Sequence, residues 1–261
     1  MRKVWLGLIV AAVSGYGMAQ QSAPVVAPAS AAQTSPAAGK NVEAKQAAEI
    51  ARMKAQMEDW AQLGRYRAAD AELPGMVEGR VVFYGDSITD AWTSNGGTFF
   101  PGRPYVNRGI SGQTTPQMLV RFRQDVVDLH PEAVVILAGT NDIAGNTGPS
   151  TLGMTEDNFR SMTEIAKANG IRVILASVTP AAAYPWKPSV ADPAAKIKDL
   201  NAWLKSYCAQ EKVTYLDYWT AMAGPDGGMK PGISKDGVHP NAKGYAIMEP
   251  LAEKAIEETL K

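Results

Sequence analysis

From residue 80 to the end of the chain, short apolar runs alternate with longer amphipathic stretches. Strands that alternate with helices in this way predict a parallel sheet with helices on both faces. The predicted strands are residues 80–84, 105–107, 133–138, 171–177 and 213–217, and the longer predicted helices are 115–129, 156–168, 193–210 and 241–260. The third run shows no polar alternation, as expected for a strand covered on both sides. The sequence therefore predicts an α/β domain with a parallel five-stranded sheet over residues 80–261.

The first 19 residues have the pattern of a signal peptide. A positive pair at 2–3 precedes an apolar run at 4–13, and small residues follow at 17 and 19. This order of charge, apolar run and small residues is typical of a secretory signal. We expect cleavage after Ala19 and export to the periplasm or beyond. An uncleaved anchor is the alternative, but the apolar run is short for a membrane span.

Residues 20–73 are predicted to precede the folded domain as two parts. Residues 20–40 are mostly Ala, Pro, Ser and Gln with almost no charge, which predicts a flexible linker. Residues 41–73 are predicted to form an amphipathic helix. One face of this helix would carry Ile50, Met53, Met57, Trp60 and Leu63. We expect this face to pack on the outside of the domain, with partner binding as the alternative.

Charge and cysteine content exclude several classes of partner. The chain has 26 Lys and Arg against 26 Asp and Glu, so its formal net charge is zero. A nucleic-acid or anionic-membrane partner needs a basic face, and neither is expected. The single cysteine, Cys208, cannot close an intramolecular disulfide and does not follow the signal, so no stable membrane anchor is expected. The oligomeric state is left open.

Residues with the chemistry of acyl transfer follow four of the predicted strands. Ser87 follows the first strand, Gly112 the second and Asn141 the third, while Asp236 and His239 follow the fifth across a loop. Ligands of such sheets bind beyond the carboxyl ends of the strands. A serine nucleophile needs a base, and the base needs a carboxylate to orient it. The oxyanion that forms needs fixed N–H donors, which Gly112, Asn141 and the N–H of Ser87 could supply.

Each of these residues also has a purely structural interpretation. Ser87 could cap a helix, Gly112 and Asn141 could be turn residues, and His239 could mark the entry to a helix. Their occurrence together at one edge of the sheet favours the functional interpretation. The other histidine, His130, precedes the third strand at the opposite edge and is expected to be structural.

Other catalytic motifs are not matched. The nucleophile elbow Gly-x-Ser-x-Gly fails because Thr89 stands two residues after Ser87. No Gly-x-Gly-x-x-Gly follows a strand, and no His, Cys or carboxylate cluster has metal-ligand spacing. We therefore expect neither a cofactor nor a metal.

Four motifs in order resemble the blocks of the SGNH (GDSL) hydrolases. They are Gly85-Asp86-Ser87-Ile88, Gly112, Gly139-Thr140-Asn141-Asp142 and Asp236-x-x-His239-Pro240. The resemblance covers about residues 80–260 and is strongest to bacterial proteins related to the platelet-activating-factor acetylhydrolase catalytic subunits. It implies a three-layer, flavodoxin-like fold and metal-free ester hydrolysis. The visible departure, Ile88 in place of the leucine of the family name, is a conservative packing change.

The resemblance also implies a role for each site residue. It makes Ser87 the nucleophile and His239 the base, with Asp236 as the acid that orients the base. Gly112 and Asn141 become oxyanion donors together with the Ser87 N–H.

We expect from these roles a serine esterase that removes short acyl groups, acetyl especially, from a carbohydrate. Tyr184 and Trp186, after the fourth strand, could rim the pocket as stacking surfaces for a sugar ring, or they could pack the loop down. The alternatives are a lysophospholipase or thioesterase of the same fold, and a non-catalytic carbohydrate-binding module.

Overall fold

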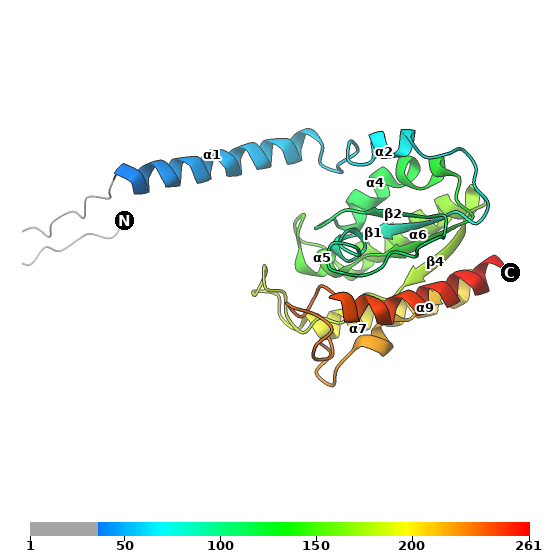
Figure 1. Ribbon diagram of the computed structural model, residues 1–261. Helices are drawn as coiled ribbons and strands as arrows, with labels where there is room; N and C mark the ends of the chain where they lie inside the picture. Colours follow the sequence, from blue (N-terminus) through cyan, green and yellow to red (C-terminus); the bar gives the residue numbers. More distant parts are fainter. Residues whose placement is uncertain (1–35) are drawn as a thin grey trace, which may run out of the picture. The chain divides into compact units, whose positions relative to one another are not determined.

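The computed structural model describes residues 36–261 (Figure 1). The predicted signal peptide, residues 1–19, and residues 20–35 of the predicted linker lie outside that range. Residues 36–40 were expected to be linker but are helical, as the start of α1 (Pro36–Glu58). The chain divides into two compact units at Ala48, within α1, and the following description concerns the second unit, Glu49–Lys261.

One sheet of five parallel strands forms the centre of this unit. Its strand order is β2-β1-β3-β4-β5. The strands are β1 (Val81–Gly85), β2 (Tyr105–Gly109), β3 (Ala133–Leu137), β4 (Arg172–Ala176) and β5 (Thr214–Leu216). Every residue of β1 and β3 is buried, because both strands lie inside the sheet and are covered on both faces. The predicted α/β fold with a parallel five-stranded sheet is confirmed.

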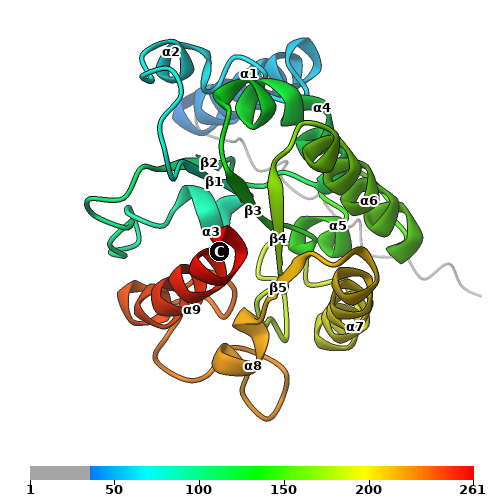
Figure 2. The same ribbon diagram turned by 90° about the vertical axis from the view of Figure 1, so that its right-hand side faces the viewer.

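Helices cover both faces of the sheet, which gives the three predicted layers (Figure 2). α4 (Thr115–Asp125), α6 (Leu152–Ala168) and α7 (Pro193–Glu211) pack on one face, against Val82 and Tyr84. α8 (Tyr218–Met222) and α9 (Ala242–Leu260) pack on the other, against Val81 and Phe83. Successive β1 side chains thus enter two separate cores, as the two-residue period of a strand requires.

The N-terminal helix prediction is wrong in its bounds. The single helix expected over residues 41–73 is instead α1 and a short α2 (Arg67–Ala71), joined by turns. Asp59 ends the first helix because its carboxylate accepts the N–H groups of Leu63 (2.7 Å) and Gly64 (2.9 Å) in place of the helical ladder. The predicted apolar face is exposed at Ile50, Met53, Met57 and Trp60, contrary to the expectation that it packs on the domain.

Three short helices that the sequence analysis did not predict begin directly after strands. α3 (Ser87–Asp90) follows β1, α5 (Thr140–Ala144) follows β3 and α8 follows β5. The helix predicted over residues 115–129 is α4 followed by a 3₁₀ turn, η1 (Val127–Leu129). Helices of four or five residues are too short to show a periodic apolar pattern. Two of them nonetheless position residues of the predicted site.

Candidate active site

Ser87 lies in the sharp turn between β1 and α3. Asp86, not Ser87, is the N-cap of α3, and its Oδ1 accepts the Ile88 N–H at 3.0 Å. The Ser87 hydroxyl is therefore not used as a cap. The turn requires glycine at position 85, because a Cβ there would lie 2.2 Å from Thr89 Oγ1. The sequence around Ser87 thus leaves its Oγ free for another partner.

That partner is the imidazole of His239, which lies 152 residues away in sequence. Ser87 Oγ is 2.9 Å from His239 Nε2. On the other side of the ring, His239 Nδ1 is 2.6 Å from Asp236 Oδ2. The structure thus brings the three predicted residues into one continuous hydrogen-bonded chain. In the neutral ring, a proton on Nδ1 directed at the carboxylate leaves Nε2 as an acceptor for the serine hydroxyl.

The Asp236–His239 loop is held by hydrogen bonds that are local in sequence. Asp236 Oδ1 accepts the N–H of Val238 at 2.9 Å and that of His239 at 2.8 Å. Ser234 Oγ accepts the Gly237 N–H at 2.9 Å and donates to the His239 carbonyl at 2.7 Å. The spacing Asp-x-x-His therefore forms a turn in which the carboxylate holds both the backbone and the ring of the histidine.

The same contacts keep Asp236 ionised. Burial raises the pKa of Asp236, but the hydrogen bonds from the backbone and ring of His239 and from Val238 outweigh it, and the pKa falls to about 2. A carboxylate that accepts several N–H bonds is stabilised in its charged form. It can therefore stabilise a positive charge that forms on the His239 ring.

Gly112 and Asn141 are the two predicted oxyanion donors besides the Ser87 N–H. Gly112 has φ +80°, a left-handed conformation in which glycine is favoured. Asn141 follows Gly139 in the first turn of α5 and is buried. Its Nδ2 lies 3.0 Å from the Gln113 carbonyl and 3.3 Å from Asp86 Oδ2. Both predicted oxyanion donors therefore border the cavity that Ser87 opens into.

Asn146, which the sequence analysis missed, joins these two donors. Its Nδ2 donates to Asn141 Oδ1 at 2.8 Å and to the Gly112 carbonyl at 3.2 Å. Its Oδ1 accepts the indole N–H of Trp186 at 3.1 Å. The only sequence signal for Asn146 is its position five residues after Asn141, directly behind Gly145, so its role depends on the three-dimensional contacts.

Asp86 is a buried carboxyl next to Ser87 in the sequence. Burial raises the pKa of Asp86 to about 7, although the Ile88 N–H and the nearby His239 favour its charged form. The pKa of Asp142, in the same α5 turn as Asn141, is also raised by burial, while its hydrogen bonds from Thr115 oppose that shift. The two sides of the site therefore differ in electrostatics, with an ionised carboxylate behind His239 and desolvated carboxyls behind Asn141.

A cavity of about 510 Å³ connects these groups. It is lined by Ser87, Ala91, Asn95, Ser111, Gly112, Asn141, Asn146, Trp186, Lys235, Asp236, His239, Pro240 and Asn241. Trp186 is 41% exposed, and its ring lies 6.0 Å from that of His239.

The prediction that Tyr184 rims the pocket is wrong. Tyr184 is 1% exposed, and its hydroxyl bonds Thr140 Oγ1 at 3.0 Å beneath the loop. It packs the loop down and supports Trp186 from below, at a ring distance of 5.1 Å. His130, by contrast, is placed as predicted, at the end of η1 before β3 and at the other edge of the sheet.

Within residues 36–261, no three His, Cys, Asp or Glu side chains are grouped as metal ligands. In the same range, no helix has the length and apolar composition to cross a membrane.

Comparison with known proteins places this geometry in a family context. The model of the GDSL-like lipase/acylhydrolase family matches residues 83–247. An uncharacterized lipoprotein of Bacillus subtilis is 35% identical over 79 residues, or 29% of this chain. The chain spans 32% of the length of that curated relative.

Solved structures resemble the chain over most of its length. A candidate acylhydrolase from Bacteroides fragilis is 48% identical, with a TM-score of 0.75 over 77% of this chain and 99% of its own. A GDSL-like lipase from Bacteroides thetaiotaomicron is 46% identical, with a TM-score of 0.73 over 76% of this chain and 98% of its own. A candidate platelet activating factor from Streptococcus pneumoniae shares the fold at 22% identity, with a TM-score of 0.65 over 82% of this chain and 99% of its own.

Proposed function

The chain belongs to the GDSL-like lipase/acylhydrolase family, and from that premise we propose that it is a serine esterase specific for short acyl groups. The observation that carries this proposal is the hydrogen-bonded chain from Ser87 Oγ through the His239 ring to Asp236. A serine, a neutral imidazole and an ionised carboxylate in this order are the parts that activate a hydroxyl nucleophile.

The proposed reaction has two steps. His239 Nε2 takes the hydroxyl proton while Ser87 Oγ attacks the ester carbonyl, and the same ring then gives the proton to the leaving alcohol. Water, activated in turn by His239, hydrolyses the acyl-enzyme and regenerates Ser87. Asp236 keeps its charge throughout and stabilises the imidazolium in each step, which its pKa of about 2 supports.

Three N–H donors are proposed for the tetrahedral oxyanion. They are the backbone N–H groups of Ser87 and Gly112 and the Nδ2 of Asn141. Fixed donors in such a position each contribute about 3–4 kcal/mol to the transition state. In the structure Asn141 Nδ2 contacts Asp86 and the Gln113 carbonyl. Donation to the oxyanion would replace the longer of these contacts, the one of 3.3 Å to Asp86.

The cavity lining supports a short acyl group on a polar leaving group. By residue type its side chains are mostly amide, hydroxyl or charged, and the apolar ones are those of Ala91, Trp186 and Pro240, although carbon atoms form most of the exposed lining. A long acyl chain needs extended apolar surface, because each buried CH₂ is stabilised by about 0.8 kcal/mol. The half-exposed Trp186, in a cavity that four asparagines also line, supports a carbohydrate as the leaving group, since sugar rings stack on aromatic faces and hydrogen-bond to amides.

Hydrolysis of p-nitrophenyl acetate tests this proposal. We expect turnover by the wild type and loss of at least about 10³-fold in Ser87→Ala. Comparison of acetate with octanoate, and then release of acetate from acetylated xylan, separates a short-chain carbohydrate esterase from a lysophospholipase or thioesterase. Wild-type turnover in Ser87→Ala would contradict the mechanism, and faster octanoate hydrolysis would contradict the short-chain assignment.

We also propose that the protein is exported after cleavage at Ala19. The support is the charged, apolar and small-residue order of residues 1–19. Mass spectrometry of the full-length chain expressed in a bacterium should find a mature N-terminus at Gln20. A chain recovered intact from the cytosol would contradict the proposal.

A further inference from the structure

We infer that residues 59–71, which we call the strap, hold the Gly112 loop, residues 109–113, in the position that oxyanion binding requires. The inference rests on the proposed function, because it gives the strap a role in the same site. The strap precedes residue 83, where the family match begins. The strap therefore adds a positioning element that lies outside the family match.

Three glutamine side chains fix the strap to the domain through its backbone. Gln113 Nε2 donates to the Ala61 carbonyl at 2.8 Å. Gln117 Nε2 donates to the Trp60 carbonyl at 2.6 Å, and Gln124 Nε2 to the Leu63 carbonyl at 2.7 Å. Because these bonds join side-chain amides to main-chain oxygens, they fix the path of the strap without specifying its side chains. Ala61 is buried at this contact.

Two strap contacts reach the ends of the Gly112 loop. The Tyr66 hydroxyl donates to the Gly109 carbonyl, and Ala61 accepts from Gln113. Gly112 lies between these two held residues. The pKa of Tyr66 is raised, chiefly by burial, so its hydroxyl remains protonated and available as a donor.

A third contact reaches the middle of the loop through Asp90. Asp90 Oδ2 accepts the Ser111 N–H at 3.1 Å and the Ser111 hydroxyl at 2.6 Å. Arg65 of the strap lies 3.7 Å from the other oxygen of the same carboxylate. This ion pair is partly exposed, so we expect it to contribute less than the two buried ends.

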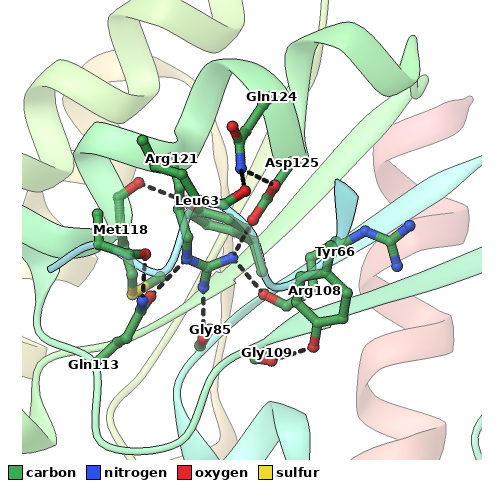
Figure 3. Close-up of polar contacts among 12 residues, drawn as sticks. Leu63, Tyr66, Gly85, Arg108, Gly109, Gln113, Met118, Arg121, Gln124 and Asp125 are labelled. Carbon is green, nitrogen blue, oxygen red and sulfur yellow. Dashed lines mark hydrogen bonds and ion pairs between the residues drawn. The ribbon is translucent and has the colours of Figure 1, made fainter. Parts of the chain in front are cut away.

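Arg121 connects the same loop to the Ser87 turn (Figure 3). Its Nε donates to Gln113 Oε1 at 2.5 Å, and its Nη2 donates to the Gly85 carbonyl at 3.0 Å. Asp125 pairs with the guanidinium at 2.8 Å, and both side chains are fully buried. Gln113 therefore contacts the strap through its amide nitrogen, and through its amide oxygen it contacts Arg121, which binds the Gly85 carbonyl. A shift of the strap would be transmitted to the Gly112 loop and to the turn that carries Ser87.

The outer end of the strap is fixed by a second arginine. Arg108 Nε donates to Asp70 Oδ1 at 2.8 Å, and its guanidinium lies 4.6 Å from the centre of the Tyr66 ring. Tyr66 is thus held in place by its ring independently of its hydroxyl. Replacement of Tyr66 by phenylalanine removes the bond to Gly109 and leaves this packing surface.

Gly112 is positioned by hydrogen bonds and not by close packing. It has the left-handed φ of +80°, and a Cβ built there meets only Asn146 Nδ2, at 4.0 Å. The loop backbone is therefore held by the strap at its two ends, by Asp90 at Ser111 and by the Asn146 amide at the Gly112 carbonyl. A displacement of about 1 Å in a catalytic donor is enough to cost a large factor in rate.

The test compares Tyr66→Phe with Gln124→Leu in the full-length chain. Each variant removes one hydrogen bond to the strap, and Gln124→Leu also removes the bond of 3.0 Å from Gln124 to Asp125, but of the two residues only Tyr66 contacts the Gly112 loop. For Tyr66→Phe we expect kcat with p-nitrophenyl acetate to fall about tenfold and KM to stay within about twofold, as for the loss of a transition-state interaction. For Gln124→Leu we expect both constants within about twofold and only a lower unfolding temperature.

Hydrogen exchange of residues 109–113 gives a readout that does not depend on catalysis. We expect exchange in this loop to be about tenfold faster in Tyr66→Phe than in the wild type, and unchanged in Gln124→Leu. Equal kcat and equal exchange in Tyr66→Phe and the wild type would overturn the inference. A wild type without esterase activity would contradict the proposed function instead, and the exchange comparison would still decide whether the strap holds the loop.

Discussion

The proposed base and the proposed oxyanion donors of this site are held by two different kinds of structure. His239 is held by a loop whose hydrogen bonds span only two to five residues, through Asp236 and Ser234. Asn141 is held by Asp86, which follows β1, by the Gln113 carbonyl and by Asn146, and the Gly112 loop is held through Gln113 by Arg121 of α4 and by the strap. The first arrangement is half-exposed and local, whereas the second is assembled from distant parts of the chain, with Asn141 buried and Gly112 exposed.

This difference indicates how each side should respond to mutation. A local loop can lose one side chain without disturbing the core, so substitutions there should affect chemistry more than stability. A buried polar network shares its members among several partners, so substitutions there should affect both. The following experiments test that distinction, from the largest expected effect to the smallest.

His239→Ala should show the largest effect. We expect kcat for p-nitrophenyl acetate to fall by about 10⁴–10⁶-fold, because the proposed base, which contacts Ser87 Oγ, is lost. The unfolding temperature should stay close to that of the wild type, because the ring is partly exposed and lies in a local loop. Unfolding far below the wild-type temperature would contradict the description of this side as local.

Asp236→Asn should cost less, about 10³–10⁴-fold in kcat, because the base remains while its orientation and charge support are lost. The matched comparison is with His239→Ala in the same assay. A larger loss in Asp236→Asn than in His239→Ala would mean that the carboxylate does more than orient the ring.

Asn141→Ala should reduce kcat by about 10²–10³-fold, the range for loss of one oxyanion donor. It should also lower the unfolding temperature, since it leaves the Asn146 amide and the Gln113 carbonyl without their buried partner. Full stability in Asn141→Ala, measured by thermal unfolding, would contradict the contrast drawn between the two sides.

The two carboxyls of the site should give opposite dependences of stability on pH. The folded pKa of Asp86, about 7, is above its ordinary 3.8, so its protonated form is favoured on folding and stability falls as pH rises from 4 to 7. The folded pKa of Asp236, about 2, is below 3.8, so its contribution is present above pH 4 and is lost as pH falls towards 2.

Unfolding temperatures across these two windows test the contrast. Relative to the wild type, Asp86→Asn should gain stability between pH 5 and pH 8, because the cost of ionising a buried carboxyl is removed. Between pH 4 and pH 2, Asp236→Asn should lose less stability than the wild type. If the unfolding temperature of a variant changes with pH in the same way as that of the wild type, the pKa shift assigned to that carboxyl is contradicted.

The local side of the site was the more predictable from sequence. Asp236 and His239 are only three residues apart, so the turn that joins them could be predicted from the sequence. Ser87 could be predicted because it closely follows the apolar run of β1. The strand and long-helix order also follows from periodicity, which is why the sheet agrees with the prediction.

What sequence reasoning missed depends on contacts between distant residues. Gln113, Gln117 and Gln124 gave no motif, since their role is to bind the carbonyls of a segment about 50–60 residues earlier. Tyr184 was misplaced because an aromatic residue in a loop has the same sequence signature whether it faces the pocket or packs beneath it. Periodicity reports which face of an element is apolar and not which loop side chains meet.

Covalent labelling by a fluorophosphonate probe, mapped by peptide mass spectrometry, tests the central claim most directly. The probe should modify Ser87 in the wild type and leave both Ser87→Ala and His239→Ala largely unlabelled, because the hydroxyl reacts only when the imidazole accepts its proton. Labelling of a different residue, or equal labelling in His239→Ala, would contradict the account of Ser87 as a nucleophile activated by His239.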